Sequence, residues 1–216
     1  MSELRELGFD LETIGDKTIV PFLPAVEANK TYKDPFKIKE DIESKKLKQL
    51  EGLGLRPGTN IICCASFIDM QTDAVTSLVL TPDLDEKKLL QDIWEIMHPY
   101  DRFISFNGNK FDVPVLRFHS MLHKVPMPVK LSTSKYHRGN HIDLRNELND
   151  GDEFAKGDFD FYCKRLGGTG KTVMESGAEV QGYWDAGRID EIVAYNQEDV
   201  KNLAFLYRRM KGYFDF

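Results

Sequence analysis

Five short stretches of the chain are apolar throughout, or alternate apolar with polar residues, and these predict β-strands. Two of them flank the polar residues Gln71, Thr72 and Asp73, which predicts a hairpin. The predicted strands are residues 4–11, 61–69, 74–80, 102–106 and 141–144.

Other segments carry apolar residues every three or four positions and predict helices. The first of these follows Asp34 and Pro35, which suit the cap and the first position of a helix. The predicted helices are residues 36–50, 84–97, 112–123, 159–166 and 190–211. Three leading strands, a helix, a strand and then mostly helices predict an α/β fold with a mixed central β-sheet flanked by α-helices.

The organisation along the chain predicts one domain. A length of 216 residues suits a single core, and we find neither an internal repeat nor a low-complexity segment. Residues 21–33 and 167–182 look irregular, and Pro57-Gly58 marks a turn. Residues 29–58 separate the first two strands and predict a charged helical insertion into residues 1–216.

Acidic residues interrupt the core pattern at three places. Asp10 and Glu12 lie two apart on the first strand, so both side chains project to one face. Adjacent carboxylates repel one another unless a cation lies between them. The alternative is a strand end at which both acids meet water.

The last predicted helix has an apolar row that includes Ile192, Leu203 and Met210. Tyr195 and Asp199 occupy the missing positions of this row. A carboxylate there costs several kcal/mol unless it is paired, hydrogen-bonded or bound to a metal. The alternative is that Asp199 lies at the edge of the row and pairs with an Arg or Lys.

Asp112 follows a strand and a glycine turn, at the start of a helix, where a plain helix cap is the alternative interpretation. Together with Asp10, Glu12 and Asp199 it gives four carboxylates on or near inward-facing positions. Oxygen ligands of this kind select Mg²⁺ or Mn²⁺. Such a set suits a two-ion site for phosphoryl transfer.

These residues form three motifs in the order of a known family. The motifs are Asp10-x-Glu12, Asn107-x-x-x-Phe111-Asp112 and Tyr195-x-x-x-Asp199. The chain resembles the DEDD-type 3′–5′ exonucleases, which have a ribonuclease H-like fold. Over nearly its whole length it looks closest to the proofreading exonuclease domains of family B DNA polymerases and to stand-alone, phage-like relatives. Tyr195 resembles the tyrosine subclass (DEDDy), because Ala194 stands where the sister subclass carries histidine.

The resemblance implies a metal-dependent exonuclease that hydrolyses terminal phosphodiesters of single-stranded DNA, with two Mg²⁺ or Mn²⁺ ions as cofactors. The four carboxylates would hold the ions, and the hydroxyl of Tyr195 would orient the attacking water. Thr13 and Asn107 would contact the terminal nucleotide, Phe111 would stack or pack near it, and Asp143 would be a supporting acid outside the metal ligands.

The resemblance also implies partners and leaves two alternatives open. A separate DNA polymerase or replication protein is an expected partner, and DNA replication or DNA repair an expected role. The alternatives are a non-catalytic nucleic-acid-binding module of the same fold and a 3′–5′ exoribonuclease, because selection by the 2′-hydroxyl depends on local shape.

Charge is unevenly spread along this acidic chain, whose net charge is −6. Residues 113–142 contain no Asp or Glu but several basic residues, among them Lys135 and Arg138. This tract predicts phosphate contacts, with Tyr136 as a base platform; an ordinary solvated loop is the alternative. Lys171 follows a glycine-rich run, but Arg165 stands where a P-loop requires glycine, so we expect a phosphate contact rather than an NTPase.

The remaining composition is that of an ordinary globular protein, with 41% hydrophobic residues. Cys63 and Cys64 lie in an apolar run, which predicts buried thiols in a reducing compartment. With no visible signal peptide or membrane span, we expect a cytoplasmic protein, bacterial or phage-like. His119 and His123 have a spacing that can bind zinc, although solvent or phosphate contacts are favoured.

Overall fold

A computed structural model describes residues 4–81, 84–134, 139–152, 155, 157–174 and 176–216. Its centre is a five-stranded sheet in the order β3-β2-β1-β4-β5. The strands are β1 (Glu6–Gly15), β2 (Asn60–Asp69), β3 (Val75–Val79), β4 (Arg102–Ser105) and β5 (His141–Asp143). β1, β2 and β3 pair antiparallel, whereas β4 runs parallel to both β1 and β5. The sheet is therefore mixed, as the sequence predicts.

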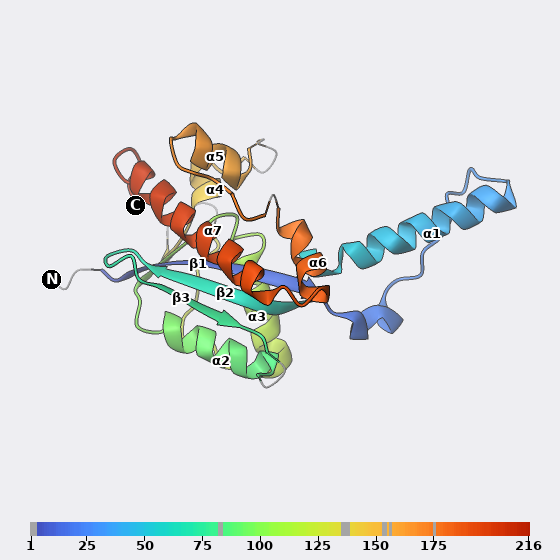
Figure 1. The fold of residues 1–216 in the computed structure, drawn as a ribbon, viewed down its shortest axis with the longest axis horizontal. Coiled ribbons are helices and arrows are strands. Elements are labelled where there is room, and N and C mark those ends of the chain that lie inside the picture. The colour runs from blue at the N-terminus through green and yellow to red at the C-terminus, as the bar shows by residue number, and fades with distance from the viewer. Residues whose placement is uncertain (1–3, 82–83, 135–138, 153–154, 156, 175) are drawn as a thin grey trace.

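Helices cover both faces of this sheet (Figure 1). The α-helices are α1 (Pro35–Glu51), α2 (Glu86–Met97), α3 (Asp112–His123), α4 (Leu144–Leu148), α5 (Phe159–Arg165), α6 (Val180–Asp185) and α7 (Ile189–Met210). Short 3₁₀ turns are η1 (Lys17–Phe22), η2 (Leu53–Leu55) and η3 (Gly177–Glu179). α2 and α3 pack on one face of the sheet, in a buried apolar cluster that includes Leu7, Phe9 and Leu11 of β1. α7 packs on the other face. The result is a three-layer α/β arrangement.

All five predicted strands and all five predicted helices are present, and α3 has the predicted bounds. Two differences have physical causes. β1 continues to Gly15 instead of ending at Leu11, because its second half pairs with the start of β2. The irregular segment 167–182 contains η3 and the start of α6, short elements that periodicity over a long window does not detect.

The two faces of β1 carry different chemistry. Leu7, Phe9 and Leu11 belong to the buried cluster beneath α2 and α3. The alternate residues Asp10 and Glu12 therefore project toward the face that α7 covers. Since β1 extends past both acids and Glu12 is only 7% exposed, the interpretation of a strand end in water is wrong.

A close approach between α7 and β1 depends on Gly8. A Cβ atom at this position would lie 2.6 Å from Met70 Cε and 3.3 Å from Leu203 Cδ2 of α7. The missing side chain leaves room for Met70 and for Leu203 of α7 beside the first half of β1. Gly8 thus contributes to the spacing between β1 and the residues of α7.

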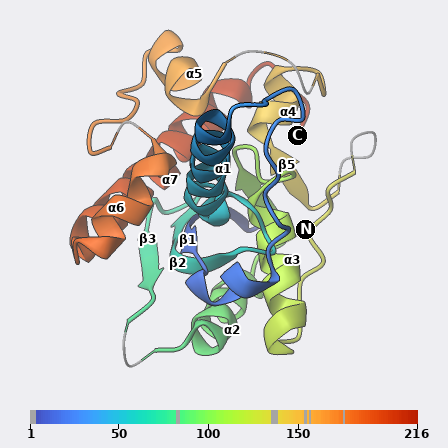
Figure 2. The same cartoon turned by 90° about the vertical axis from the view of Figure 1, so that its right-hand side faces the viewer.

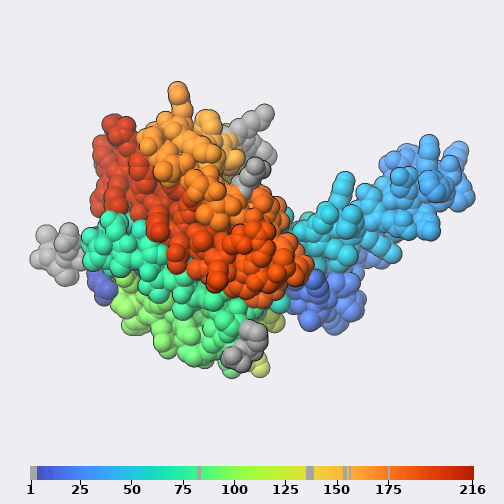
Figure 3. Space-filling view, in the orientation of Figure 1, coloured from blue at the N-terminus to red at the C-terminus, as the bar shows by residue number. Residues whose placement is uncertain are grey.

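The expected insertion is an arm that projects away from the sheet. α1 contains no buried residue, and Figures 1 and 3 show it extending well beyond the rest of the molecule. Figure 2 looks along the molecule and shows the arm leaving from the end of the sheet. As predicted, Asp34 caps the helix: its side chain accepts a hydrogen bond from the backbone N–H of Phe36. The arm returns through η2, where Leu53 is buried.

The cysteines are buried, as predicted, and all three are free thiols. The register between β1 and β2 shifts at Glu12/Thr13, which leaves Cys63 without a partner residue in β1. Cys63 and its neighbour Cys64 both join the buried cluster near Tyr195. Within the part of the chain that the structure describes, no helix combines the length and apolar character needed to cross a membrane.

Candidate active site

Three carboxylates from distant parts of the chain meet on the α7 side of the sheet. Asp10 and Glu12 come from β1, and Asp199 from the middle of α7. One carboxylate oxygen from each lies within 4.8 Å of the other two. The three also line one cavity, together with Asn107 and Tyr195. The predicted convergence of β1 and the last helix is therefore observed.

Asp112 lies beside this group rather than within it. It begins α3, whose N-cap is Phe111, so the interpretation of Asp112 as the helix cap is wrong. Its Oδ1 instead accepts a hydrogen bond from the backbone N–H of Leu11, at 3.1 Å. This bond fixes the fourth carboxylate next to the strand that carries Asp10 and Glu12.

Burial and mutual repulsion disfavour negative charge on these acids. Desolvation raises the pKa of Asp10 and of Glu12 well above their usual range, and the neighbouring carboxylates raise both further. Desolvation likewise raises the pKa of Asp112, to about 7. Desolvation also raises the pKa of Asp199, against the opposing effect of Lys171. A bound cation would relieve this repulsion.

Two observations test whether divalent ions fit the group. The donor set consists of carboxylate oxygens, which are the ligands that Mg²⁺ and Mn²⁺ prefer. Oδ1 of Asp199 is buried and has no hydrogen-bond partner, which is costly for an anionic oxygen. An ion coordinated by this oxygen would satisfy it, so the residues present fit the expected ions.

Lys171 places a positive charge next to Asp199 and Tyr195. Its Nζ lies 3.1 Å from Oδ2 of Asp199 and donates a hydrogen bond to the hydroxyl of Tyr195. Asp199 lies in the buried row of α7, so the interpretation that placed it at the edge of the row is wrong, whereas the pairing with a lysine is observed. Lys171 lines the same cavity, and its expected contact with a phosphate stays a prediction.

A turn between β4 and α3 forms the opposite wall of the cavity. Asn107 has φ of 65°, a left-handed conformation that asparagine tolerates. Asp143 holds the turn by accepting the backbone N–H groups of Asn107 (2.8 Å) and Asn109 (3.0 Å). The side-chain Oδ1 of Asn107 accepts a hydrogen bond from Arg145. Asp143 therefore supports the wall, and its place outside the metal ligands stays a prediction.

The other expected substrate contacts lie in different surroundings. Thr13 is buried, and its hydroxyl donates to the carbonyl of Gly54 at 2.5 Å, so a contact with a nucleotide would require that bond to break. Phe111 lines the cavity and also packs against the core. Lys135 and Arg138 fall outside the residues that the structure describes, and with them Tyr136.

One residue of the site escaped the sequence analysis. Asn196 is fully buried, and its Nδ2 donates to Oδ2 of Asp10 at 2.6 Å. Its Oδ1 accepts a weak hydrogen bond from the thiol of Cys64. Asn196 lies four positions after Ile192 and three before Asp199, in the buried row of α7. A polar side chain in a buried row must be hydrogen-bonded, and this was the signal in the sequence.

Comparisons with known proteins show a family and a fold. The family described as "Predicted 3'-5' exonuclease related to the exonuclease domain of PolB" matches residues 59–215. DNA polymerase 1 of Sulfolobus acidocaldarius is 38% identical over 64 residues, which are 27% of this chain and 7% of that polymerase. The family B DNA polymerase of the archaeon Pyrobaculum calidifontis superposes with a TM-score of 0.67 at 16% identity, over 97% of this chain and 25% of that one.

The structural match shows the fold, and confirms the expected ribonuclease H-like α/β architecture. The chain spans only a small part of the length of both polymerases. The family match begins after the arm, so Asp10 and Glu12 lie outside its bounds. The structural match covers nearly the whole chain and includes the segment with β1.

Proposed function

Since the chain belongs to the family of predicted 3′–5′ exonucleases related to the exonuclease domain of PolB, we propose that it shortens single-stranded DNA from the 3′ end with two divalent ions. The observation that carries the proposal is the meeting of Asp10, Glu12 and Asp199 within 4.8 Å in a cavity. Three carboxylates this close, buried and with one lysine beside them make a poor structural core. They make a good binding site for divalent ions.

The residues of the chain have distinct roles in this proposal. Asp10, Glu12 and Asp199 would be direct ligands, and Asp112 would complete the set from beside the strand. When bound, Mg²⁺ or Mn²⁺ would supply the Lewis acidity that activates a water and neutralises the leaving oxygen. Asn196 would hold Asp10 in its ligating orientation through the 2.6 Å hydrogen bond.

Tyr195 and Lys171 would act on the reacting groups. The tyrosine hydroxyl remains protonated, because desolvation and the neighbouring carboxylates raise its pKa far above neutrality. It would orient the attacking water as a hydrogen-bonding group rather than as a base, as expected of the tyrosine subclass. Lys171 would exchange its contact with Asp199 for the scissile phosphate once ions bind to the acids.

The reaction itself is a hydrolysis at the last phosphodiester. The oxygen of water forms a bond to phosphorus, the bond from phosphorus to the 3′ oxygen breaks, and a nucleoside 5′-monophosphate leaves. The shortened strand keeps a 3′-hydroxyl, so the cycle can repeat. A separate DNA polymerase or replication protein is the partner we propose, in DNA replication or repair.

The test uses single strands of DNA and RNA, each labelled at either the 5′ or the 3′ end, with Mg²⁺ or Mn²⁺. We expect 5′-labelled DNA to give a ladder of shorter products and 3′-labelled DNA to release labelled mononucleotide at once. Asp199→Asn should abolish both, and Asp215→Asn, at an exposed acid, should not. Degradation of RNA alone would assign an exoribonuclease; binding without cleavage of either strand would refute the hydrolytic proposal.

A further inference from the structure

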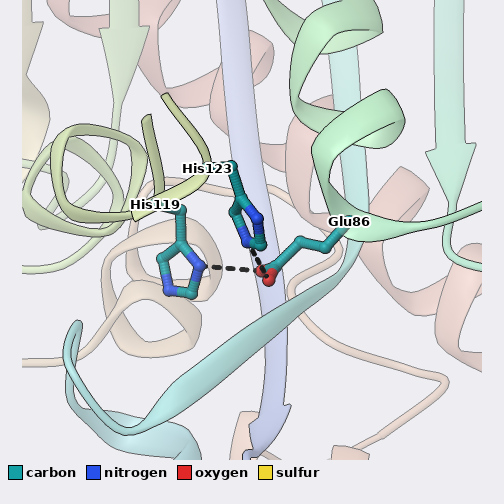
Figure 4. A group of neighbouring side chains, drawn as sticks. All are labelled: Glu86, His119 and His123. Atoms are coloured by element: carbon teal, nitrogen blue, oxygen red, sulfur yellow. Dashed lines mark hydrogen bonds and ion pairs between the residues drawn. The ribbon is translucent and has the colours of Figure 1, made fainter. Parts of the chain in front are cut away.

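A second group of potential metal ligands lies on the opposite face of the sheet. Glu86 is the first residue of α2, and His119 and His123 occupy neighbouring turns near the end of α3. Figure 4 shows both imidazole rings pointing at the Glu86 carboxylate. One ligand atom from each residue lies within 4.8 Å of the others. None of these residues belongs to the acidic cavity.

The surroundings of His119 leave one ring nitrogen unsatisfied. The side chain is 1% exposed, so the expected solvent or phosphate contact is wrong for this residue. Its Nε2 lies 2.9 Å from Oδ1 of Asn60. The amide nitrogen of Asn60 is engaged by the carbonyl of Gly54, which leaves Oδ1 to accept the proton of Nε2. Nδ1 of His119 is the ring nitrogen that has no hydrogen-bond partner.

This nitrogen faces the Glu86 carboxylate. Nδ1 of His119 lies 2.8 Å from Oε1 of Glu86, yet it makes no hydrogen bond of acceptable geometry. A ring nitrogen and a carboxylate oxygen at that distance need a proton or a metal ion to offset their repulsion. Oε2 of Glu86 lies 2.8 Å from Nε2 of His123, so the carboxylate joins both rings. Oε1 is further oriented by the backbone N–H of Ile62 at 2.7 Å.

We propose that Glu86, His119 and His123 bind a transition-metal ion, Zn²⁺ by preference, that ties the start of α2 to the end of α3. Two imidazole nitrogens and one carboxylate oxygen are an established ligand set for zinc. The hydrogen bond from His119 Nε2 to Asn60 is the outer contact that zinc-bound histidines typically make. The side chain of His123 is 26% exposed, which gives the ion a path in and leaves room for a water ligand.

The two sites should differ in the ions they prefer. Imidazole nitrogen favours zinc, copper and nickel, whereas the all-carboxylate group favours Mg²⁺ and Mn²⁺. The proposed zinc site shares no residue with the acidic cavity, so the proposal does not rest on nuclease activity. The interaction would hold together two helices that pack under β1, including the helix that begins with Asp112.

The test is a titration of chelator-treated protein with Zn²⁺ against a competing chromophoric chelator. His123→Gln removes a partly exposed ligand, and His98→Gln removes an exposed histidine outside the cluster as a matched control. We expect His123→Gln to weaken Zn²⁺ binding by about tenfold or more, and His98→Gln to leave it unchanged. Zn²⁺ should also raise the thermal midpoint of the parent and of His98→Gln only.

A measurement on the unaltered protein guards against a variant that fails to fold. X-ray absorption of the Zn²⁺-loaded parent should show scattering from two imidazole rings. An ion ligated by oxygen alone would overturn the proposal, as would equal affinity in the parent and His123→Gln. Failure of the parent to bind Zn²⁺ at micromolar concentration would show that a proton, and not a metal, joins the two histidines to Glu86.

Discussion

The buried carboxylate of Asp112 offers a direct test of the idea that the acidic group is unstable without cations. Asp112 is 2% exposed, and burial raises its pKa from the usual 3.8 to about 7. The native protein therefore retains a proton that the unfolded chain loses near pH 4. Stability must fall as pH rises between these two values, because the native state binds more protons there.

The magnitude follows from the same two pKa values. A rise from 3.8 to about 7 corresponds to a penalty of about 4 kcal/mol once the carboxyl is ionised. Asp112→Asn removes the ionisation but keeps an oxygen that can accept the N–H of Leu11. In chelator, we expect the variant to be more stable than the parent at pH 8 by up to about 4 kcal/mol, and the difference to vanish near pH 4.

The assay is urea unfolding from pH 4 to 8 in EDTA, followed by circular dichroism. Asp215→Asn, at an exposed acid, is the control and should follow the parent at every pH. Excess Mg²⁺ should stabilise the parent more than Asp112→Asn and so narrow the difference at pH 8. If Asp112→Asn is less stable than the parent in EDTA at pH 8, the reasoning that burial disfavours the charge on Asp112 is refuted.

Three further predictions concern the strand, the helix and the arm. Tyr195→Phe should lower kcat about a hundredfold on single-stranded DNA with little change in KM, since only orientation of the water is lost; an unchanged kcat would remove the tyrosine from the reaction. Gly8→Ala should cost about 1–3 kcal/mol in urea unfolding, because its Cβ would lie 2.6 Å from Met70 Cε and 2.7 Å from Ile68 Cγ2; no cost would mean that these side chains move aside freely. Replacing residues 24–51, none of them buried, by a short Gly/Ser linker should change the free energy of unfolding by about 0.5 kcal/mol or less, and a large loss would show that the arm packs against the body.

Much of the fold could be predicted because its signals are local. The alternation of apolar and polar residues on the strands and the apolar row of α7 can each be recognised from a few neighbouring residues. The helix cap at Asp34 can be recognised in the same way. The acids at positions 10, 12 and 199 were visible because each contradicts its apolar surroundings. A charge in a core position is conspicuous in any sequence.

The rest of the site depends on contacts between distant segments, which no local pattern encodes. The hydrogen bond from Leu11 to Asp112 joins residues 101 positions apart. The carbonyl of Gly54 engages the hydroxyl of Thr13 only because the arm returns to β1. Glu86 contacts both histidines only because α2 packs beside α3. No spacing in the sequence links Glu86 to His119 and His123. Such pairs become visible only in three dimensions.

The alternation along β1 has a consequence for how the chain finds its native pairing. Because Leu7, Phe9 and Leu11 face one layer while Asp10 and Glu12 face the other, a slip by one residue would place both acids in the apolar cluster under α2 and α3 and turn Phe9 toward α7. The wrong alignment carries its own electrostatic penalty. The acids at positions 10 and 12 therefore disfavour the wrong register of β1 during folding. A single-residue insertion or deletion early in β1 would be among the least tolerated changes in the chain.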